Sequence, residues 1–199
     1  MKILAFVDLH SDFTYLKKII KTAKEKQPDF LVCAGDISDF GNDIEKIFKE
    51  LSELNIPMLI IPGNHESSST INQLCKKYKF AVNINKACYE VNEYCFLGYG
   101  EGGFSEEDPE FDELAEKFKK NLDKNKKLIL VSHAPVYGTK VDYLSTLGHR
   151  GNKSIRRFIA EVKPKLVICG HFHDTATQID RIGYTTIINP GKYGKIILI

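Results

Sequence analysis

The sequence lacks several features that would place it among membrane-spanning or metal-thiolate proteins. No apolar stretch in its 199 residues approaches the roughly 18 needed to cross a bilayer, and no C-x-x-C spacing is present. The first apolar run is too short for a signal peptide, so we expect a cytoplasmic protein. Charge of one sign is not in excess either. A net charge of +2 gives no broad basic surface, which argues against nucleic acid and against a membrane surface as partners.

The five cysteines are odd in number and scattered, which is not the pattern of a disulfide framework. Cys33 and Cys169 lie inside apolar runs that are typical of buried strands. Cys88 and Cys95 would face each other across a hairpin, but we expect free thiols there rather than a disulfide. The prediction for all five is therefore a reduced thiol.

The chain does have the composition of a globular domain. It is 43% hydrophobic and 27% charged, and residues 1–199 are interpreted as a single domain. Three apolar runs, each followed by an amphipathic stretch, predict strands at 3–7, 30–34 and 57–61 and helices at 11–27, 43–54 and about 69–79. Because the strands are apolar throughout, they predict an α/β fold with a parallel sheet covered on both faces.

The second half of the chain predicts shorter strands and two further helices. Antiparallel strands are expected at 80–84, 87–91 and 94–98, helices at 110–123 and about 152–162, and buried strands at 128–131 and 166–169. The tail predicts strands at 175–181, 184–188 and 195–199. We expect the last of these inside a sheet, although its apolar character also fits a dimer edge.

Metal-ligand residues gather where these buried strands end. The set is Asp8, His10, Asp36, Asn64, His65, His133, His171 and His173, and it holds five of the six histidines. Open α/β sheets bind ligands at the carboxyl ends of their strands. Oxygen and imidazole donors without cysteine suit Mn²⁺, Fe²⁺, Co²⁺ or Zn²⁺. Eight such residues exceed the needs of one ion and suit two ions roughly 3.5–4 Å apart.

Asp8 and His10 follow the first predicted strand and are two residues apart. Side chains alternate along a strand, so we expect both residues to project the same way from its end. Taken alone, the pair also fits an aspartate that caps the next helix beside a packed histidine. The carboxylates, amide and imidazoles that follow the other strands favour a metal site over this alternative.

Five motifs in order carry a resemblance to a known family. They are Asp8-x-His10, Gly35-Asp36-x-x-Asp39, Gly63-Asn64-His65-Glu66, His133 and Gly170-His171-x-His173. This pattern resembles the calcineurin-like metallophosphoesterases. The resemblance implies a four-layer α/β/β/α sandwich with two packed mixed sheets, which periodicity alone does not predict.

The resemblance also implies roles for the residues. It assigns one metal ion to Asp8, His10, Asp36 and His173, and a second to Asp36, Asn64, His133 and His171. Asp36 would bridge the ions, and a hydroxide between them would attack phosphorus in line. His65 would protonate the leaving oxygen or stabilise the transition state. Asp39 and Glu66 are candidates for orienting the ligands.

Several of these residues have simpler interpretations. Asp39 fits a cap of the following helix about as well as an orienting role. For Glu66 we favour a solvated or capping position. Ser132 stands beside His133, but no carboxylate–histidine pair is spare to activate it as a nucleophile.

The sequence also contains candidates for contacts with the substrate. His149, Arg150 and Arg156 lie in a segment that follows His133, and arginine pairs well with phosphate, so we name these three as phosphate-contact candidates. The alternative is a polar loop beside a solvated helix face. The acidic loop at 99–113 would repel phosphate at the site, so we expect it to be solvated or to act as a lid.

The function predicted from the sequence is a dinuclear metal-dependent phosphohydrolase. A phosphodiesterase acting on a small ester is the first expectation, with Mn²⁺ as the metal and Fe, Co, Ni or Zn as alternatives. A phosphomonoesterase with the same site is the near alternative. A non-catalytic scaffold on the same fold is the distant one. The sequence leaves monomer and homodimer open.

Overall fold

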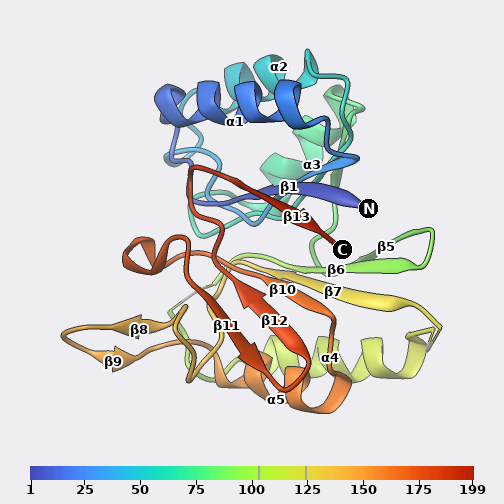
Figure 1. Ribbon diagram of the computed structural model, residues 1–199, viewed down its shortest axis with the longest axis vertical. Coiled ribbons are helices and arrows are strands. Elements are labelled where there is room, and N and C mark those ends of the chain that lie inside the picture. Colours follow the sequence, from blue (N-terminus) through green and yellow to red (C-terminus); the bar gives the residue numbers. More distant parts are fainter. Residues whose placement is uncertain (103, 124) are drawn as a thin grey trace.

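Two mixed β-sheets pack face to face, and helices cover the outer face of each (Figure 1). The computed structural model describes residues 1–102, 104–123 and 125–199. Helices α1 (Phe13–Lys26), α2 (Ile44–Ser52) and α3 (Ser68–Lys77) cover one sheet, and α4 (Pro109–Asn121) and α5 (Lys153–Val162) cover the other. The four-layer α/β/β/α sandwich is therefore confirmed.

The first sheet has the strand order β13-β1-β2-β3-β4. Its strands are β1 (Lys2–Phe6), β2 (Phe30–Cys33), β3 (Met58–Ile60), β4 (Ala81–Asn83) and β13 (Lys195–Leu198). Strands β1 to β4 run parallel, and β13 pairs antiparallel with β1. The tail strand is thus internal to the fold, as expected. The antiparallel prediction for 80–84 was wrong, because Ala81 pairs in parallel with Met58 of β3.

The second sheet has the strand order β11-β12-β10-β7-β6-β5. Its strands are β5 (Cys88–Val91), β6 (Tyr94–Tyr99), β7 (Lys127–Ser132), β10 (Leu166–Ile168), β11 (Ile179–Ile182) and β12 (Thr185–Ile188). The segment between β7 and α5, expected to be a loop, carries a small hairpin, β8 (Tyr143–Leu144) and β9 (Gly148–His149). A 3₁₀ turn, η1 (His173–Thr175), follows β10 where we expected the start of a strand.

Side-chain alternation explains why the sheets stack. In β1, Leu4 and Phe6 face the helices, where they pack with Leu16 and Ile19 of α1. Ile3 and Ala5 point the other way and pack in the core between the two sheets. The N-terminal end of α1 is closed by Asp12, whose carboxylate accepts the backbone N–H groups of residues 14 and 15. Strands that are buried on both faces need apolar residues throughout, which is what the sequence has.

The hairpin of β5 and β6 corrects the cysteine prediction. Cys88 lies opposite Leu97 and Cys95 lies opposite Glu90, so the two cysteines are diagonal neighbours on one face of the hairpin. The structure joins them in a disulfide, with their Cα atoms 6.1 Å apart. The expectation of free thiols was wrong for this pair. Cys33, Cys75 and Cys169 are free, as expected.

Among the residues that the structure describes, every helix is too short or too polar to cross a lipid bilayer.

Candidate metal centre

The carboxyl ends of strands from both sheets meet at one site. Donor atoms cluster there in three overlapping groups: Asp8, His10 and His173; His10, Asp36 and His65; and Asp36, His133 and His171. Within each group the donor atoms lie within 4.8 Å of one another. The strand-end histidines and carboxylates singled out from the sequence are thus brought together.

Asp36 lies at the centre of this site and is almost completely buried. Its Oδ2 is 3.4 Å from His133 Nε2, 3.6 Å from His10 Nε2 and 4.0 Å from His65 Nε2. Burial alone would raise the pKa of this carboxyl, but the close approach of His133 and the N–H of His65 outweigh it and hold the pKa at about 2. Asp36 is therefore a carboxylate that faces three imidazoles at once.

His133 and Asn64 show that a cation fits the site. His133 Nδ1 lies 2.9 Å from the carbonyl oxygen of Ala34, which only accepts hydrogen bonds, so this nitrogen carries the hydrogen. Burial acts to lower the pKa of this ring, but the hydrogen bond to Asp36 and the charge of that carboxylate outweigh it and raise the pKa, so a bound cation would take the place of the Nε2 hydrogen. Nε2 of His133 lies 2.9 Å from Asn64 Oδ1, and His171 Nδ1 lies 2.9 Å from the same oxygen. Ring nitrogens and an amide oxygen that converge in this way suit a divalent ion, and a hydrogen bond from His133 Nδ1 to a carbonyl is a typical support of a metal-binding histidine.

The same convergence occurs at the other end of the site. Nε2 of His10 and Nε2 of His173 are 2.9 Å apart. Burial lowers the pKa of His10 although Asp36 acts to raise it, and burial together with the charge of His133 lowers the pKa of His171 to about 4. Both rings are therefore neutral near pH 7, which is the form of imidazole that binds metals.

Left-handed backbone, and not strand alternation, aims the ligands. Strand β1 ends at Phe6, so Asp8 and His10 lie beyond it, and the expected alternation does not act on them. Their φ angles are 55° and 46°, and Asp36 and His171 have φ of 49° and 70°. Non-glycine residues seldom adopt this conformation, and it clusters at functional sites, where the surrounding structure holds the strain.

Gly63 shows how tightly the loops after β2 and β3 approach each other. A Cβ atom at this position would lie 2.0 Å from Asp36 Oδ1 and 2.5 Å from the backbone nitrogen of Asp36. Only glycine therefore allows the Asp36 carboxylate to occupy its place.

Glu66 holds the same two loops together. Its Oε1 accepts the backbone N–H of Ser38 (2.8 Å) and the Ser38 hydroxyl (2.7 Å), and its Oε2 accepts the N–H of Gly63 (3.2 Å). The side chain is buried, and this burial raises its pKa. Helix α3 is capped by Ser67. The expectation of a solvated or capping Glu66 was wrong.

Asp39 also lies against the site. Its Oδ1 is 3.3 Å from His65 Nδ1. The capping alternative fails, since the residue at the start of α2 is Asp43, which makes no side-chain cap. Ser132 is buried and donates its hydroxyl hydrogen to the carbonyl of Ala134, so this hydrogen is bonded to a backbone carbonyl and not to a histidine base.

Two aromatic residues at the site were missed from the sequence. The Phe40 ring stacks on His65 with centroids 3.9 Å apart, and the Phe104 ring meets His171 edge to face at 4.5 Å. Both phenylalanines are largely exposed, at 72% and 78%. Phe104 thus brings the acidic loop to the site by an apolar group. The position of Phe40 directly after Asp39 was the one available signal.

The three phosphate-contact candidates lie outside the three groups of donors. Arg150 Nη1 pairs with Glu106 at 3.1 Å, and Arg156 Nη1 donates to the carbonyls of Tyr137 and Gly138. His149 Nδ1 lies 2.7 Å from Asp142 Oδ1. Glu106 of the acidic loop therefore pairs with one of the two arginines, and both arginines already have partners within the protein.

A family model described as calcineurin-like phosphoesterase matches residues 1–175. The chain belongs to the calcineurin-like phosphoesterase family. It is 34% identical over 200 residues to the uncharacterized protein MJ1162 of Methanocaldococcus jannaschii, covering 96% of this chain and 88% of the relative. It is 26% identical over 188 residues to a probable glycerophosphodiester phosphodiesterase, GpdQ, of Arcobacter nitrofigilis, covering 87% of this chain and 66% of that protein.

A solved structure of TT1561 from Thermus thermophilus shares the fold with a TM-score of 0.76, at 18% identity and with 96% and 88% of the two chains covered. This calcineurin-like phosphoesterase is accordingly a hydrolase of phosphate esters in a metal-dependent family, and it has candidate ligand groups where its family motifs lie.

Proposed function

We propose that this phosphoesterase is a dinuclear phosphodiesterase. The observation that carries the proposal is the position of Asp36, whose Oδ2 lies 3.4 to 4.0 Å from three imidazole nitrogens and whose carboxylate belongs to two of the donor groups. Asp36 would bridge two ions. The first ion would also take Asp8, His10 and His173, and the second would also take Asn64, His133 and His171.

The donor set supports a borderline or hard ion. Carboxylate, amide and imidazole donors suit Mn²⁺ first, with Fe, Co, Ni or Zn as alternatives. When bound, two such ions would neutralise phosphate charge and make water acidic enough to supply hydroxide near neutral pH.

His65 is the proposed proton donor to the leaving oxygen. Its Nε2 lies 4.0 Å from Asp36 Oδ2, and its ring stacks on Phe40 and lies beside the carboxylate of Asp39. A ring placed in this way offers Nε2 to a substrate bound at the metal centre. Because His65 would act on the substrate and not on the ions, its loss is expected to spare metal binding.

The charge of the surroundings favours a diester over a monoester. A phosphodiester carries one negative charge, whereas a monoester carries nearly two near neutral pH and needs further cations. Arg150 and Arg156 are already engaged by Glu106 and by backbone carbonyls. The relative named as a glycerophosphodiester phosphodiesterase supports the same choice.

The test compares bis-p-nitrophenyl phosphate with p-nitrophenyl phosphate after EDTA treatment and reloading with Mn²⁺. We expect hydrolysis only in the reloaded protein and a higher kcat/KM for the diester. Reloading with Mg²⁺, Zn²⁺, Ni²⁺ or Co²⁺ at equal concentration identifies the preferred ion. A higher kcat/KM for the monoester would assign a phosphomonoesterase, and hydrolysis that survives full metal removal would refute the dinuclear proposal.

A further inference from the structure

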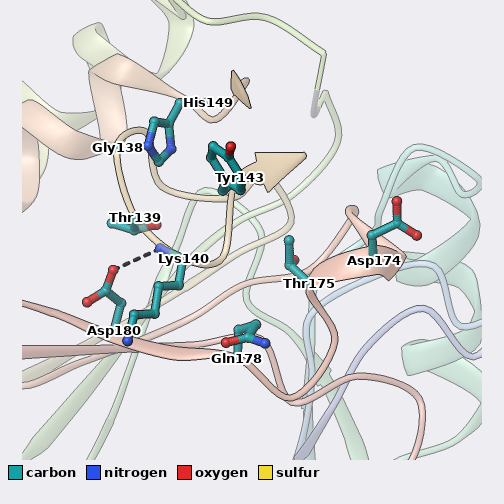
Figure 2. Close-up of a pocket in the computed structure, with 9 residues that line it drawn as sticks. All are labelled: Gly138, Thr139, Lys140, Tyr143, His149, Asp174, Thr175, Gln178 and Asp180. Carbon is teal, nitrogen blue, oxygen red and sulfur yellow. Dashed lines mark hydrogen bonds between the residues drawn. The ribbon is translucent and has the colours of Figure 1, made fainter. Parts of the chain in front are cut away.

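A cavity of about 480 Å³ lies between the β8–β9 hairpin and the turn that follows β10 (Figure 2). Its lining includes Lys140, Tyr143, His149, Asp174, Gln178 and Asp180. One wall follows the candidate metal centre along the chain, because Asp174 and Thr175 of the lining come directly after His173 in η1. The Thr175 hydroxyl donates to the carbonyl of Val141 at 2.8 Å and so ties that wall to the opposite loop.

A buried carboxylate fixes one side chain of this cavity. Asp142 is completely buried and accepts the backbone N–H groups of Gly138 (3.1 Å), Thr139 (2.8 Å) and Gly151 (2.9 Å). Its Oδ1 also lies 2.7 Å from His149 Nδ1. A carboxylate only accepts hydrogen bonds, so His149 Nδ1 carries the hydrogen and Nε2 of the neutral ring is an acceptor.

The remaining lining is also rich in acceptors. The carboxylates of Asp174 and Asp180 and the amide of Gln178 stand against a single ammonium group, that of Lys140. The two negative charges of Asp174 and Asp180 against the one positive charge of Lys140 disfavour a phosphate group in the cavity. The ring of Tyr143, edge to face with His149 at 5.2 Å, adds an apolar surface. Acceptors around a partly apolar surface suit a ligand that carries several hydroxyl groups on a carbon chain.

We propose that this cavity binds the hydroxyl-bearing alcohol arm of a phosphodiester whose phosphorus lies at the metal centre. His149 Nε2 accepts a hydrogen bond from a substrate hydroxyl, and Asp142 is a positioning residue that sets the tautomer and orientation of His149. A cavity of this size falls within the usual range for small-molecule sites. The inference rests on the proposed phosphodiesterase function and moves His149 from a phosphate contact to a contact with the arm.

The first test uses two substrates with the same phosphorus and leaving group. They are 2,3-dihydroxypropyl p-nitrophenyl phosphate and propyl p-nitrophenyl phosphate. We expect the metal-loaded protein to favour the dihydroxypropyl ester by about tenfold or more in kcat/KM, since a site built for a hydroxyl leaves its acceptor unpaired with the propyl ester. His149→Ala should bring the ratio close to one. Tyr184→Ala, an exposed aromatic residue outside this lining, is the matched control and should keep the wild-type ratio.

The second test does not depend on turnover. Isothermal titration of the metal-loaded protein with glycerol 3-phosphate and with propyl phosphate should show about tenfold tighter binding of the first, and His149→Ala should remove the difference. Asp142→Asn should weaken the same preference in the dissociation constants, and in the first test it should act through KM and not kcat. A wild-type protein that does not distinguish the two ligands, or a His149→Ala variant that loses both equally, overturns the inference. Failure on bis-p-nitrophenyl phosphate with the binding preference intact would instead refute the phosphodiesterase function.

Discussion

The two sheets contribute to the metal centre in different ways. Loops after β1, β2 and β3 supply both carboxylates of the donor groups together with His10 and His65. Glu66 joins the loops after β2 and β3, which approach so closely that position 63 accepts only glycine. The second sheet supplies imidazoles after β7 and β10, and between them it carries the long segment with the β8–β9 hairpin and the cavity. One side thus supplies the carboxylates from closely packed loops, and the other supplies imidazoles and a long connecting segment.

This division separates affinity from selectivity. Negative charge is what attracts a cation most strongly, so the first sheet should set whether metal binds at all. The long segment on the second sheet contacts whatever extends beyond the metals, so it should set which ester is accepted. The variants below test that division, because each side predicts a different readout.

The largest effect is expected from Asp36→Asn. The change preserves volume but removes the carboxylate shared by two donor groups. We expect kcat/KM to fall by about 10³-fold or more, on the scale of a lost electrostatic contact in an active site, together with metal content. Elemental analysis and bis-p-nitrophenyl phosphate kinetics measure the two. Asp39→Asn, which also neutralises an acid near His65, is the control and should keep its metal. Full metal content in Asp36→Asn would remove the bridging role.

A smaller effect on metal binding is expected from His133→Ala on the second sheet. This side chain is fully buried and belongs to one donor group only, so one ion of the proposed pair should remain. The variant should also lose about 1–3 kcal/mol of unfolding free energy, because the Ala34 carbonyl loses its partner. Metal content and urea denaturation test both points. Loss of both ions would show that the two sheets contribute equally to affinity.

His65→Ala should separate rate from binding. We expect kcat to fall by about 10²-fold, at the lower end for a lost general acid, with metal content unchanged. Phe40→Ala, which removes the stacking partner of the same ring, should cause a smaller loss. An unchanged rate in His65→Ala with substrates of both good and poor leaving groups would exclude proton donation by this residue.

The smallest effect is expected from Glu66→Gln. One oxygen becomes an NH₂ group that faces an N–H or O–H donor, so the variant should lose about 1–3 kcal/mol of unfolding free energy. Its activity should fall by about tenfold, as for other residues that orient metal ligands. Glu53→Gln, on an exposed glutamate, should change neither quantity. A full rate in Glu66→Gln would mean that Ser38 and Gly63 keep their places without it.

Much of the fold could be predicted from local pattern. The apolar runs predicted every strand that leads to a site residue, because a strand buried on both faces must be apolar throughout. The parallel pairing of β4 and the hairpin at residues 143–149 could not be predicted, since short strands take their partners from tertiary contacts.

The candidate site was predictable in its members but not in its geometry. Alternation along β1 predicted that Asp8 and His10 point to the same site, and they do. Left-handed backbone angles, and not alternation, orient both residues. The inward position of Glu66 depends on N–H groups from two loops that are distant in sequence. The ring contacts of Phe40 and Phe104 likewise depend on loop packing that has no periodicity.

The placement of donor atoms on both sheets has a consequence for cooperativity. A bound ion with ligands from both sheets would link the two sheets to each other. At a metal concentration 100 times the dissociation constant, one such site would stabilise the folded chain by about 2.7 kcal/mol. Amide hydrogen exchange should then report the sheets as one opening unit in the loaded protein and as two in the stripped one.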